Sequence, residues 1–400
     1  MAKKMPLEGI RVLELGNLVA APFAGKIFAE FGAEVIKVEE PKKGDPLRNW
    51  RIMHGDNSVW WYVQARNKKS ITINLRDQQG QEIVKKLAGE VDVVLENFRP
   101  GTLEKWGIGY EHLSEINPSL IMTRISGYGQ TGPYSHKPGF GSVAEAFGGL
   151  RFLTGYPDRP PVRVGIAIGD LVAGLYAVIG TIMAVRARDN DPEKKGQLID
   201  VALYEAVFSL LEGILPEYDL TGLIRERTGS TLPGIAPSNT YECADGRYLV
   251  IGANGDSIFQ RLMKTMGRED LANDPKLANN QGRADNVEFI DKTIEEWTKQ
   301  RPLKEVQKLL DDASVPVGPI YSIKDIVKDE QYKSRKMLEP IELPTGETVL
   351  APGVVPKLSE TPGNLKWIGP TLGEHNEEIF KDLINMDANE IAKLKQSGVI

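Results

Sequence analysis

Residues 10–39 read IRVLELGNLVAAPFAGKIFAEFGAEVIKVE, and this stretch decides the fold. The apolar run 10–15 predicts a buried strand that ends at Gly16. A helical pattern follows over about 22–31, and residues 34–39 predict a second strand. A strand, a helix and a strand in so short a length form a βαβ unit, whose two strands pair in parallel.

The same alternation continues beyond this unit. Three further runs predict strands, at 70–75 (SITINL), 91–96 (VDVVLE) and 120–126 (LIMTRIS), and residues 78–88 predict a helix. Several βα units in series are typical of a doubly wound, Rossmann-like α/β fold, in which helices cover both faces of a parallel sheet.

The pattern changes near residue 225. A segment rich in Gly, Pro, Ser and Thr over 225–239 predicts a linker. Beyond it, a strand at 248–253 and helical periodicity over about 258–310 predict a smaller α+β domain. We therefore expect a large Rossmann-like domain, a small domain and a C-terminal return of the chain to the large domain, over 1–225, 236–325 and 335–400 respectively.

The composition is that of a globular protein with a large core. The chain has 400 residues, of which 41% are hydrophobic and 26% charged, and its net charge is −6. An acidic chain does not attract anionic partners, so we expect no general binding to nucleic acid or to a membrane surface. The single cysteine, Cys243, cannot form an intramolecular disulfide, which suits a reducing cytoplasm.

Two further features agree with a cytoplasmic protein. The N-terminal residues lack the long apolar run of a secretory signal. The longest apolar stretch, 171–185, is shorter than the roughly 20 residues that a helix needs to span a bilayer. We expect this stretch to form a buried core helix.

The first strand–helix turn is a candidate anion site. It reads GNLVAA over 16–21 and places backbone N–H groups at a helix N-terminus, where anions are favoured. The turn lacks the glycines of the dinucleotide fingerprint, although Glu39 stands where a ribose-binding acid is expected. An NAD-dependent dehydrogenase therefore stays open as an alternative.

A basic segment follows. Between Lys37 and Arg76 the sequence holds nine Lys or Arg and only four Asp or Glu. This excess indicates a site for a multiply charged anion, and a solvated charged loop is the alternative. Aromatic side chains that suit the packing of an adenine ring lie in the same segment, at Trp50, Trp60, Trp61 and Tyr62.

Asp170 is the strongest candidate for a catalytic side chain. It follows Gly169, which lets a substrate approach closely, and it precedes an apolar helix expected over 171–186. There a carboxylate is stabilised by the helix dipole, so a plain N-cap and a catalytic group both fit. The four histidines and Cys243 are too scattered for metal-ligand spacing, and the sequence holds no nucleophile elbow and no P-loop.

The chain also carries an ordered set of short motifs, namely 7–13 (LEGIRVL), 31–39 (FGAEVIKVE), 44–48 (GDPLR), 67–71 (NKKSI), Asp92 with 96–101 (ENFRPG), 125–129 (ISGYG), 169–170 (GD) and 373–375 (GEH). Together these motifs resemble the class III CoA-transferases nearly from end to end. That family includes formyl-CoA, carnitine-CoA and succinyl-CoA:dicarboxylate transferases.

The resemblance implies covalent catalysis by Asp170. Its carboxylate would attack an acyl-CoA carbonyl to give a mixed anhydride, and the CoA thiolate would convert the anhydride into an enzyme thioester. An acceptor carboxylate would then displace CoA through a second anhydride. In this scheme CoA and acyl-CoA are substrates, the partner substrate is a small carboxylic acid, and no metal or permanently bound cofactor is needed.

The resemblance also places CoA along the carboxyl edge of the sheet. The residues that it implies in CoA binding are Val19, Ala20, Lys42, Ile73, Asn74, Leu75, Arg76, Asn97, Phe98, Arg99, Lys105, Phe140 and Gly141. Members of the family form dimers of two interlocked chains, so we expect an interlocked homodimer.

Three positions depart from the family pattern. Glu40 stands where a basic residue is frequent, so Lys42 or Lys43 is expected to take that role. Gly141 stands where an acidic residue is frequent, and Glu145 is the nearest substitute. The glycine-rich lid of the formyl-CoA enzymes has its nearest counterpart in 252–255 (GANG), which disfavours a formyl/oxalate pair of substrates.

Other functions stay open at this point. An α-methylacyl-CoA racemase of the same superfamily needs a histidine near Phe140, whereas His136 lies four residues earlier. A CoA-binding member without activity would retain the fold alone. Candidates to recognise a second carboxylate are Arg163, Arg225 and Arg227, which favours succinyl-CoA as the donor and a dicarboxylic acid as the acceptor.

Overall fold

The computed structural model describes residues 4–400, which divide into two compact units. The large unit comprises residues up to 150 together with 164–221 and 333–400, and the small unit comprises 151–163 and 222–332. Residues 151–163 thus group with the small unit and not, as predicted, with the large domain.

The large unit is built on a six-stranded sheet in which every neighbouring pair is parallel. Its strands, in spatial order, are β5 (Lys68–Thr72), β2 (Glu34–Glu39), β1 (Arg11–Glu14), β6 (Val93–Glu96), β7 (Ile121–Ser126) and β8 (Leu198–Ala202). The order runs outward in both directions from β1 and β6, so the sheet is doubly wound and the predicted fold class is confirmed. Ligands of such sheets bind where the strand order reverses, here between β1 and β6.

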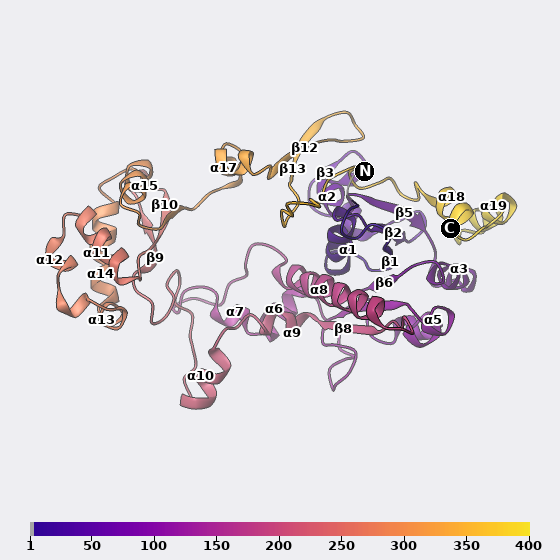
Figure 1. Ribbon diagram of the computed structural model, residues 1–400, viewed down its shortest axis with the longest axis horizontal. Helices are drawn as coiled ribbons and strands as arrows, with labels where there is room; N and C mark the ends of the chain where they lie inside the picture. The colour runs from indigo at the N-terminus through magenta and orange to yellow at the C-terminus, as the bar shows by residue number, and fades with distance from the viewer. Residues whose placement is uncertain (1–3) are drawn as a thin grey trace. The chain divides into compact units, whose positions relative to one another are not determined.

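Helices cover both faces of this sheet (Figure 1). Successive residues of β1 point to opposite faces, so that Val12 packs against one helical layer and Leu13 against the other. The layer at Val12 contains α1 (Ala20–Glu30), α6 (Gly141–Phe147), α8 (Ile168–Asn190) and α9 (Leu203–Phe208). The layer at Leu13 contains α3 (Gln78–Ala88), α5 (Tyr110–Ile116) and α19 (Ala388–Ser397).

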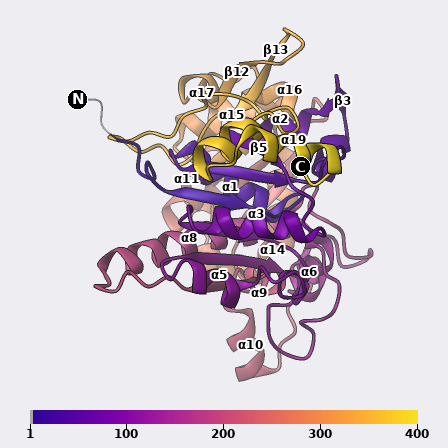
Figure 2. The same ribbon diagram turned by 90° about the vertical axis from the view of Figure 1, so that its right-hand side faces the viewer.

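The C-terminal segment of the large unit runs along the edge strand β5, where Figure 2 shows it in yellow. His375 N donates to Ser70 O at 2.9 Å, and Asn74 N donates to Val399 O at 2.7 Å. The Asn376 side chain accepts from Thr72 N at 2.8 Å. The expected return of the chain to the large unit is therefore present, and it covers the open edge of the sheet.

Short elements complete the large unit. They are the hairpin β12 (Leu338–Glu342) with β13 (Thr348–Pro352), the pair β3 (Met53–His54) with β4 (Asn57–Ser58), and the helices α2 (Val59–Gln64), α4 (Thr102–Lys105), α10 (Ile214–Thr221), α18 (Asn376–Glu378), η1 (Pro46–Asn49) and η3 (Ile379–Leu383). Helices α7 (Leu150–Leu153) and α17 (Glu330–Ser334) lie where the chain passes from one unit to the other.

The small unit has a three-stranded antiparallel sheet in the order β11 (Val317–Pro319), β10 (Tyr248–Gly252) and β9 (Ser238–Glu242). Its helices are α11 (Asp256–Thr265), α12 (Glu269–Ala272), α13 (Asn280–Asp285), α14 (Val287–Thr298), α15 (Leu303–Asp312), α16 (Ile323–Ile326) and η2 (Pro275–Leu277). Sheet and helices share one apolar core that includes Leu249, Phe259 and Ile294. This is the expected smaller α+β architecture.

Helix α8 is only half covered by its own unit. Val172, Ala177 and Ala184 are buried against the sheet, whereas Ile179 and Met183 on the opposite face are 47% and 66% exposed. Within residues 4–400, α8 is the one helix long and apolar enough to cross a membrane, a test that the core helix of a soluble protein also passes. The helix expected to be a buried core helix is therefore buried on one face only. Its other face is apolar as well, but it is exposed.

Candidate active site

Three adjoining pockets of the large unit form one groove along the carboxyl ends of the central strands. The outer pocket of about 670 Å³ includes Lys42 and Lys43, and the middle pocket of about 220 Å³ includes Asn74 and Arg76. The inner pocket of about 140 Å³ includes Asp170. The pockets are continuous because neighbours share wall residues. The outer and middle pockets share Glu40, Gly44 and Pro46. The middle and inner pockets share Asn17 and Phe98.

Asp170 lies at the inner end of the groove, in the first turn of α8. The helix begins at Ile168, three residues earlier than predicted, and its N-cap is Ala167. Asp170 is therefore not the N-cap, as the sequence had allowed, but the third helical residue. A carboxylate in the first turn is still stabilised by the N-terminal end of the helix dipole.

The carboxylate of Asp170 lies directly over the backbone of Gly141. A Cβ atom added to Gly141 would lie 2.0 Å from Asp170 Oδ2 and 2.6 Å from its Cγ, so any side chain at position 141 displaces the carboxylate. Gly169 is equally constrained, because an added Cβ there would lie 2.9 Å from Gly141 O and 3.3 Å from Glu145 Cγ. The two glycines let α6 and α8 approach closely, and Glu145 is fully buried beside this contact.

An asparagine pair fixes the turn between β1 and α1 at the point where the strand order reverses. Asn97, directly after β6, accepts from Asn17 N at 2.8 Å and donates to Asn17 O at 2.8 Å. The side chain of Asn97 thus replaces a backbone partner for Asn17 and joins the ends of β1 and β6. Leu18 follows with a positive φ of 66°, which turns the chain into α1.

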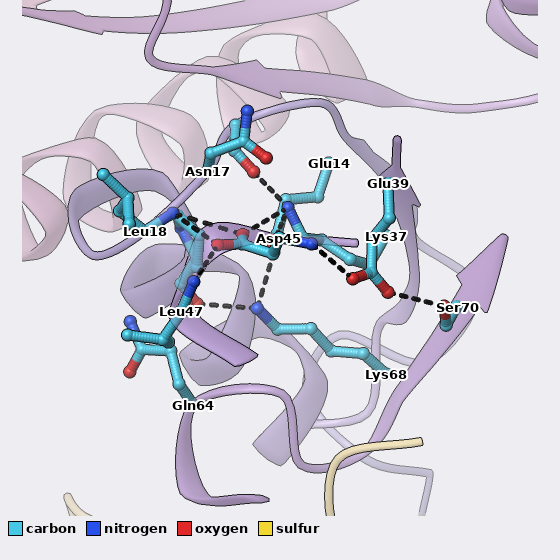
Figure 3. Close-up of polar contacts among 12 residues, drawn as sticks. Glu14, Asn17, Leu18, Lys37, Glu39, Asp45, Leu47, Gln64, Lys68 and Ser70 are labelled. Carbon is cyan, nitrogen blue, oxygen red and sulfur yellow. Dashed lines mark hydrogen bonds and ion pairs between the residues drawn. The ribbon is translucent and has the colours of Figure 1, made fainter. Parts of the chain in front are cut away.

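A buried network of charged groups supports the same turn (Figure 3). Asp45 accepts from Leu18 N at 3.1 Å, and Lys37 Nζ lies 3.0 Å from Asp45 Oδ2 and also donates to Gly16 O. Lys68 Nζ donates to Glu14 Oε2 at 2.7 Å. The turn that lines the groove is therefore held by groups that are out of contact with solvent.

The two lysines of this network respond differently to burial. Desolvation lowers the pKa of Lys37, but the carboxylates of Asp45, Glu14 and Glu39 outweigh it, so the pKa of Lys37 is raised. For Lys68 desolvation prevails over the attraction of Glu14, so its pKa is lowered. Lys37 is thus the firmly charged centre of the network.

Glu39 is committed to structural contacts. Arg48 binds both of its carboxylate oxygens, at 2.7 and 2.8 Å, and Ser70 Oγ donates to Oε1 at 2.6 Å. The carboxylate is 2% exposed, so it does not present a free acid to a ribose, and this weighs against the dehydrogenase alternative. Trp61 lies under the Arg48 guanidinium, 3.8 Å from it, and is buried too.

Only part of the basic segment faces solvent. Lys37, Arg48, Arg66 and Lys68 are buried in ion pairs, whereas Lys42, Lys43 and Arg76 border the groove. The prediction that Trp61 and Tyr62 could pack against an adenine is wrong, because both rings are buried. Some cations of this segment therefore stabilise the fold in buried ion pairs, and others are available to a ligand in the groove.

Burial raises the pKa of Glu96, the last residue of β6, to about 7, against the opposing pull of Arg124 and of Phe98 N–H. Arg124 Nε donates to Glu96 Oε1 at 2.6 Å, and Phe98 N donates to Oε2 at 2.6 Å. On its other side Arg124 pairs with Glu104 at 2.5 Å. Glu96 therefore anchors the loop that carries Asn97 and Phe98.

The groove gathers most of the residues that the sequence had suggested for CoA binding. Those in the pocket walls are Val19, Ala20, Lys42, Ile73, Asn74, Leu75, Arg76, Asn97, Phe98, Arg99 and Phe140. Gly141 touches Asp170 from behind, whereas Lys105 lies exposed on α4 and lines none of the three pockets. His136 is not among the lining residues of the inner pocket, which weighs against the racemase.

Trp106 and Lys137 are among the wall residues that sequence reasoning missed. Trp106 lines the middle pocket and packs edge-on against Phe98, with 5.5 Å between ring centroids. Lys137 lines the inner pocket with Asp170, and its ammonium lies 3.4 Å from the centroid of the Tyr134 ring. Lys137 belongs to a segment without helix or strand periodicity, so no sequence pattern pointed to it. Among residues 4–400, no His, Cys, Asp and Glu side chains cluster as a metal site.

Comparison with known proteins matches this architecture. The model of CoA-transferase family III matches residues 7–376. Succinyl-CoA--D-citramalate CoA-transferase of Chloroflexus aurantiacus is 50% identical over 396 residues, covering 99% of this chain and 98% of that protein. The succinyl-CoA--L-malate CoA-transferase alpha subunit of Chloroflexus aurantiacus is 40% identical, covering 100% and 93%. The crystal structure of a CAIB/BAIF family protein from Brucella suis superposes with a TM-score of 0.83 at 36% identity, covering 95% and 100%.

Proposed function

This chain belongs to CoA-transferase family III, and we propose that it moves CoA from succinyl-CoA to a small dicarboxylic acid through covalent intermediates on Asp170. The family membership and the CoA-transferase class agree with the resemblance drawn from the motifs. The proposed substrates follow the two named relatives, each of which pairs succinyl-CoA with a hydroxydicarboxylic acid.

The proposed exchange proceeds through four successive acyl transfers. The Asp170 carboxylate attacks the thioester carbonyl of succinyl-CoA, the C–S bond breaks, and a mixed anhydride and the CoA thiolate result. The thiolate attacks the Asp170 carbonyl and releases succinate, which leaves an enzyme-bound CoA thioester. The acceptor carboxylate attacks this thioester and frees the thiolate again. The thiolate then attacks the acceptor carbonyl of the second anhydride, which releases the new acyl-CoA and restores Asp170.

The observation that carries the proposal is the position of Asp170 at the inner end of the groove. Its carboxylate lies over a glycine backbone, in a pocket that joins the middle pocket through Asn17 and Phe98. A CoA molecule laid along the groove would bring its phosphates near Lys42 and Arg76 and its thiol towards Asp170. A nucleophile fixed in the path of the thioester is favoured by proximity and orientation.

The test compares wild-type protein with Asp170→Asn, which removes the nucleophile with little change in volume. Asp189→Asn, at the other end of α8, is the matched control. Mass spectrometry would follow CoA exchange between succinyl-CoA and a panel of dicarboxylic acids, together with the mass of the intact protein. We expect Asp170→Asn to lose at least about 1,000-fold in rate and to form no CoA adduct, while the control stays active. Exchange that survives in Asp170→Asn would refute the covalent role.

The same protein is proposed to act as an interlocked homodimer. Leu175, Ile179 and Met183 lie on one exposed stripe of α8 at helical spacing, and each is at least 46% exposed. An apolar stripe of this kind on a long helix is suited to a second protein surface. A second copy of the chain is the occupant that the family resemblance favours.

A further inference from the structure

The inner pocket has an uneven distribution of charge. Apart from Asp170, its walls include two charged side chains, Arg99 and Lys137, and both are cationic. The other polar side chains of the walls are neutral, at Asn17, Asn97 and Ser126. The reacting end of the groove therefore carries more positive charge than one carboxylate nucleophile requires.

The chemistry of CoA does not account for both of these cations. The phosphates of CoA lie at its nucleotide end, and the pantetheine arm that leads to the thiol is uncharged. Cations that suit the phosphates are already present in the outer and middle pockets, at Lys42, Lys43 and Arg76. One cation of the inner pocket therefore needs an anion from the other substrate, the acid.

Both acids of the proposed exchange supply such an anion. Succinyl-CoA has a free carboxylate at the far end of its acyl group, and a dicarboxylic acceptor has one too. Because both acyl groups react in turn at Asp170, their distal carboxylates occupy the same region of the inner pocket. One cation there would recognise the donor and the acceptor alike.

Lys137 is better placed for this role than Arg99. Its segment leads directly to Gly141 beneath Asp170, and Lys137 N donates to Tyr134 O at 2.9 Å. The same segment is fixed where Gly139 packs on Gly127, since a Cβ on either glycine would lie 2.8 Å from the Cα of the other. Arg99 instead follows Phe98, the residue shared with the middle pocket, and so belongs to the CoA side.

We infer that Lys137 is a specificity-determining residue, whose ammonium pairs with the distal carboxylate of the donor acyl group and of the acceptor acid. This inference rests on the function proposed above. The ring of Tyr134, 3.4 Å from the ammonium nitrogen, holds the lysine in place through a cation–π contact. The enzyme would therefore prefer dicarboxylic to monocarboxylic acids of the same length.

The experiment measures kcat/KM for two acceptors that differ only in the distal carboxylate, 13C-labelled succinate and butyrate, with succinyl-CoA as the donor. In a two-step exchange this parameter reports the acceptor half of the reaction alone. We expect Lys137→Met to lower kcat/KM about 10- to 100-fold for succinate, the scale of one lost charge-assisted hydrogen bond, and less than about threefold for butyrate. Lys137→Arg retains the charge and should restore the preference for succinate.

Arg99→Met is the matched variant at the second cation of the pocket and should lower kcat/KM for both acceptors by the same factor. An equal fall for both acceptors in Lys137→Met would overturn the inference, as would a selective loss of succinate in Arg99→Met. If the wild-type enzyme exchanges succinate and Lys137→Met has the same kcat/KM for it, this inference alone is overturned. A wild-type enzyme that exchanges no acid overturns the proposed function together with it.

Discussion

At the scale of single residues, the site depends on a side chain that is missing. Gly141 leaves room for the Asp170 carboxylate, which would otherwise lie 2.0 Å from a Cβ atom. In the family pattern this position frequently carries an acidic residue. In this chain an acidic side chain at position 141 would clash with the carboxylate of Asp170. The buried carboxyl of Glu145 lies one helical turn further along α6.

Substitution of Gly141 by alanine should therefore impair catalysis more than stability. The added methyl group displaces the nucleophile, and a displacement of about 1 Å can cost on the order of 100-fold in rate. We expect kcat to fall about 10- to 100-fold with a smaller change in KM for succinyl-CoA, measured by the CoA-exchange assay. Gly165→Ala is the control, because a Cβ there meets nothing within 4 Å. Equal activity of the two variants would contradict the observed packing.

Glu96 provides a pH prediction at the same scale. Its pKa is raised by burial from the ordinary 4.5 to about 7, so the folded protein retains a proton that the unfolded chain loses. The stability from this proton is complete below about pH 4.5 and is lost as the pH rises through about 7. Relative to wild type, Glu96→Gln should gain up to about 3 kcal/mol in unfolding free energy between pH 5 and 8, measured by urea unfolding.

Glu104 also pairs with Arg124, but its pKa is shifted in the opposite direction from that of Glu96. Burial opposes ionisation of Glu104, but its hydrogen bond from Arg124 prevails and lowers its pKa. The stability from this group is present above its ordinary pKa and is lost in acid, as the pH falls through the lowered value. Glu104→Gln should therefore lose stability relative to wild type as the pH rises from about 3 to 5. If the unfolding free energies of Glu96→Gln and Glu104→Gln changed with pH in the same way, the two carboxyls would not have opposite pKa shifts.

At the scale of elements, the turn between β1 and α1 depends on buried charge. Asp45 accepts from the backbone of Leu18 and of Leu47 and pairs with Lys37, and the side chains of Asp45 and Lys37 are both buried. Since Leu18 lines the inner pocket, the network links the stability of the fold to the shape of the groove.

Asp45→Asn should destabilise the protein by about 3 kcal/mol, because it leaves Lys37 without its nearest buried counter-charge. Urea unfolding measures the loss, and KM for succinyl-CoA should rise as the turn loosens. Asp77→Asn is the matched control, since Asp77 is the partly exposed N-cap of α3 and asparagine caps about as well as aspartate. A similar loss in both variants would show that the charge of Asp45 is not what matters.

The elements also show what a sequence can predict. Strand β2 was predictable to the residue, because the run EVIKVE holds the β-branched residues Val35, Ile36 and Val38 and lies between Gly32 and Pro41. The start of α8 was not, since Ile168 and Gly169 join the helix through packing on α6 rather than through local preference. The burial of Lys37 and Lys68 could not be predicted either, because their partner Glu14 is distant in the sequence.

At the scale of the whole molecule, the exposed apolar stripe of α8 bears on assembly. If it is covered by a second copy, wild type should have the mass of two 44.2 kDa chains in light scattering coupled to gel filtration. Ile179→Asp places a charge in the middle of the stripe and should shift the mass towards one chain. Phe289→Asp is the control, an equally exposed apolar residue on α14 of the small unit. An unchanged dimer in Ile179→Asp would place the interface elsewhere.

The segment that closes the edge of β5 has a consequence for the synthesis of the protein. Ser70 and Thr72 leave the ribosome more than 300 residues before their partners His375 and Asn376, and the small unit is translated in between. Until then the nascent chain presents an unpaired strand edge, the feature through which growing polypeptides join other strands. Slow translation or premature release would therefore favour aggregation over folding, and a chaperone that shields β5 would have the whole length of the small unit in which to act.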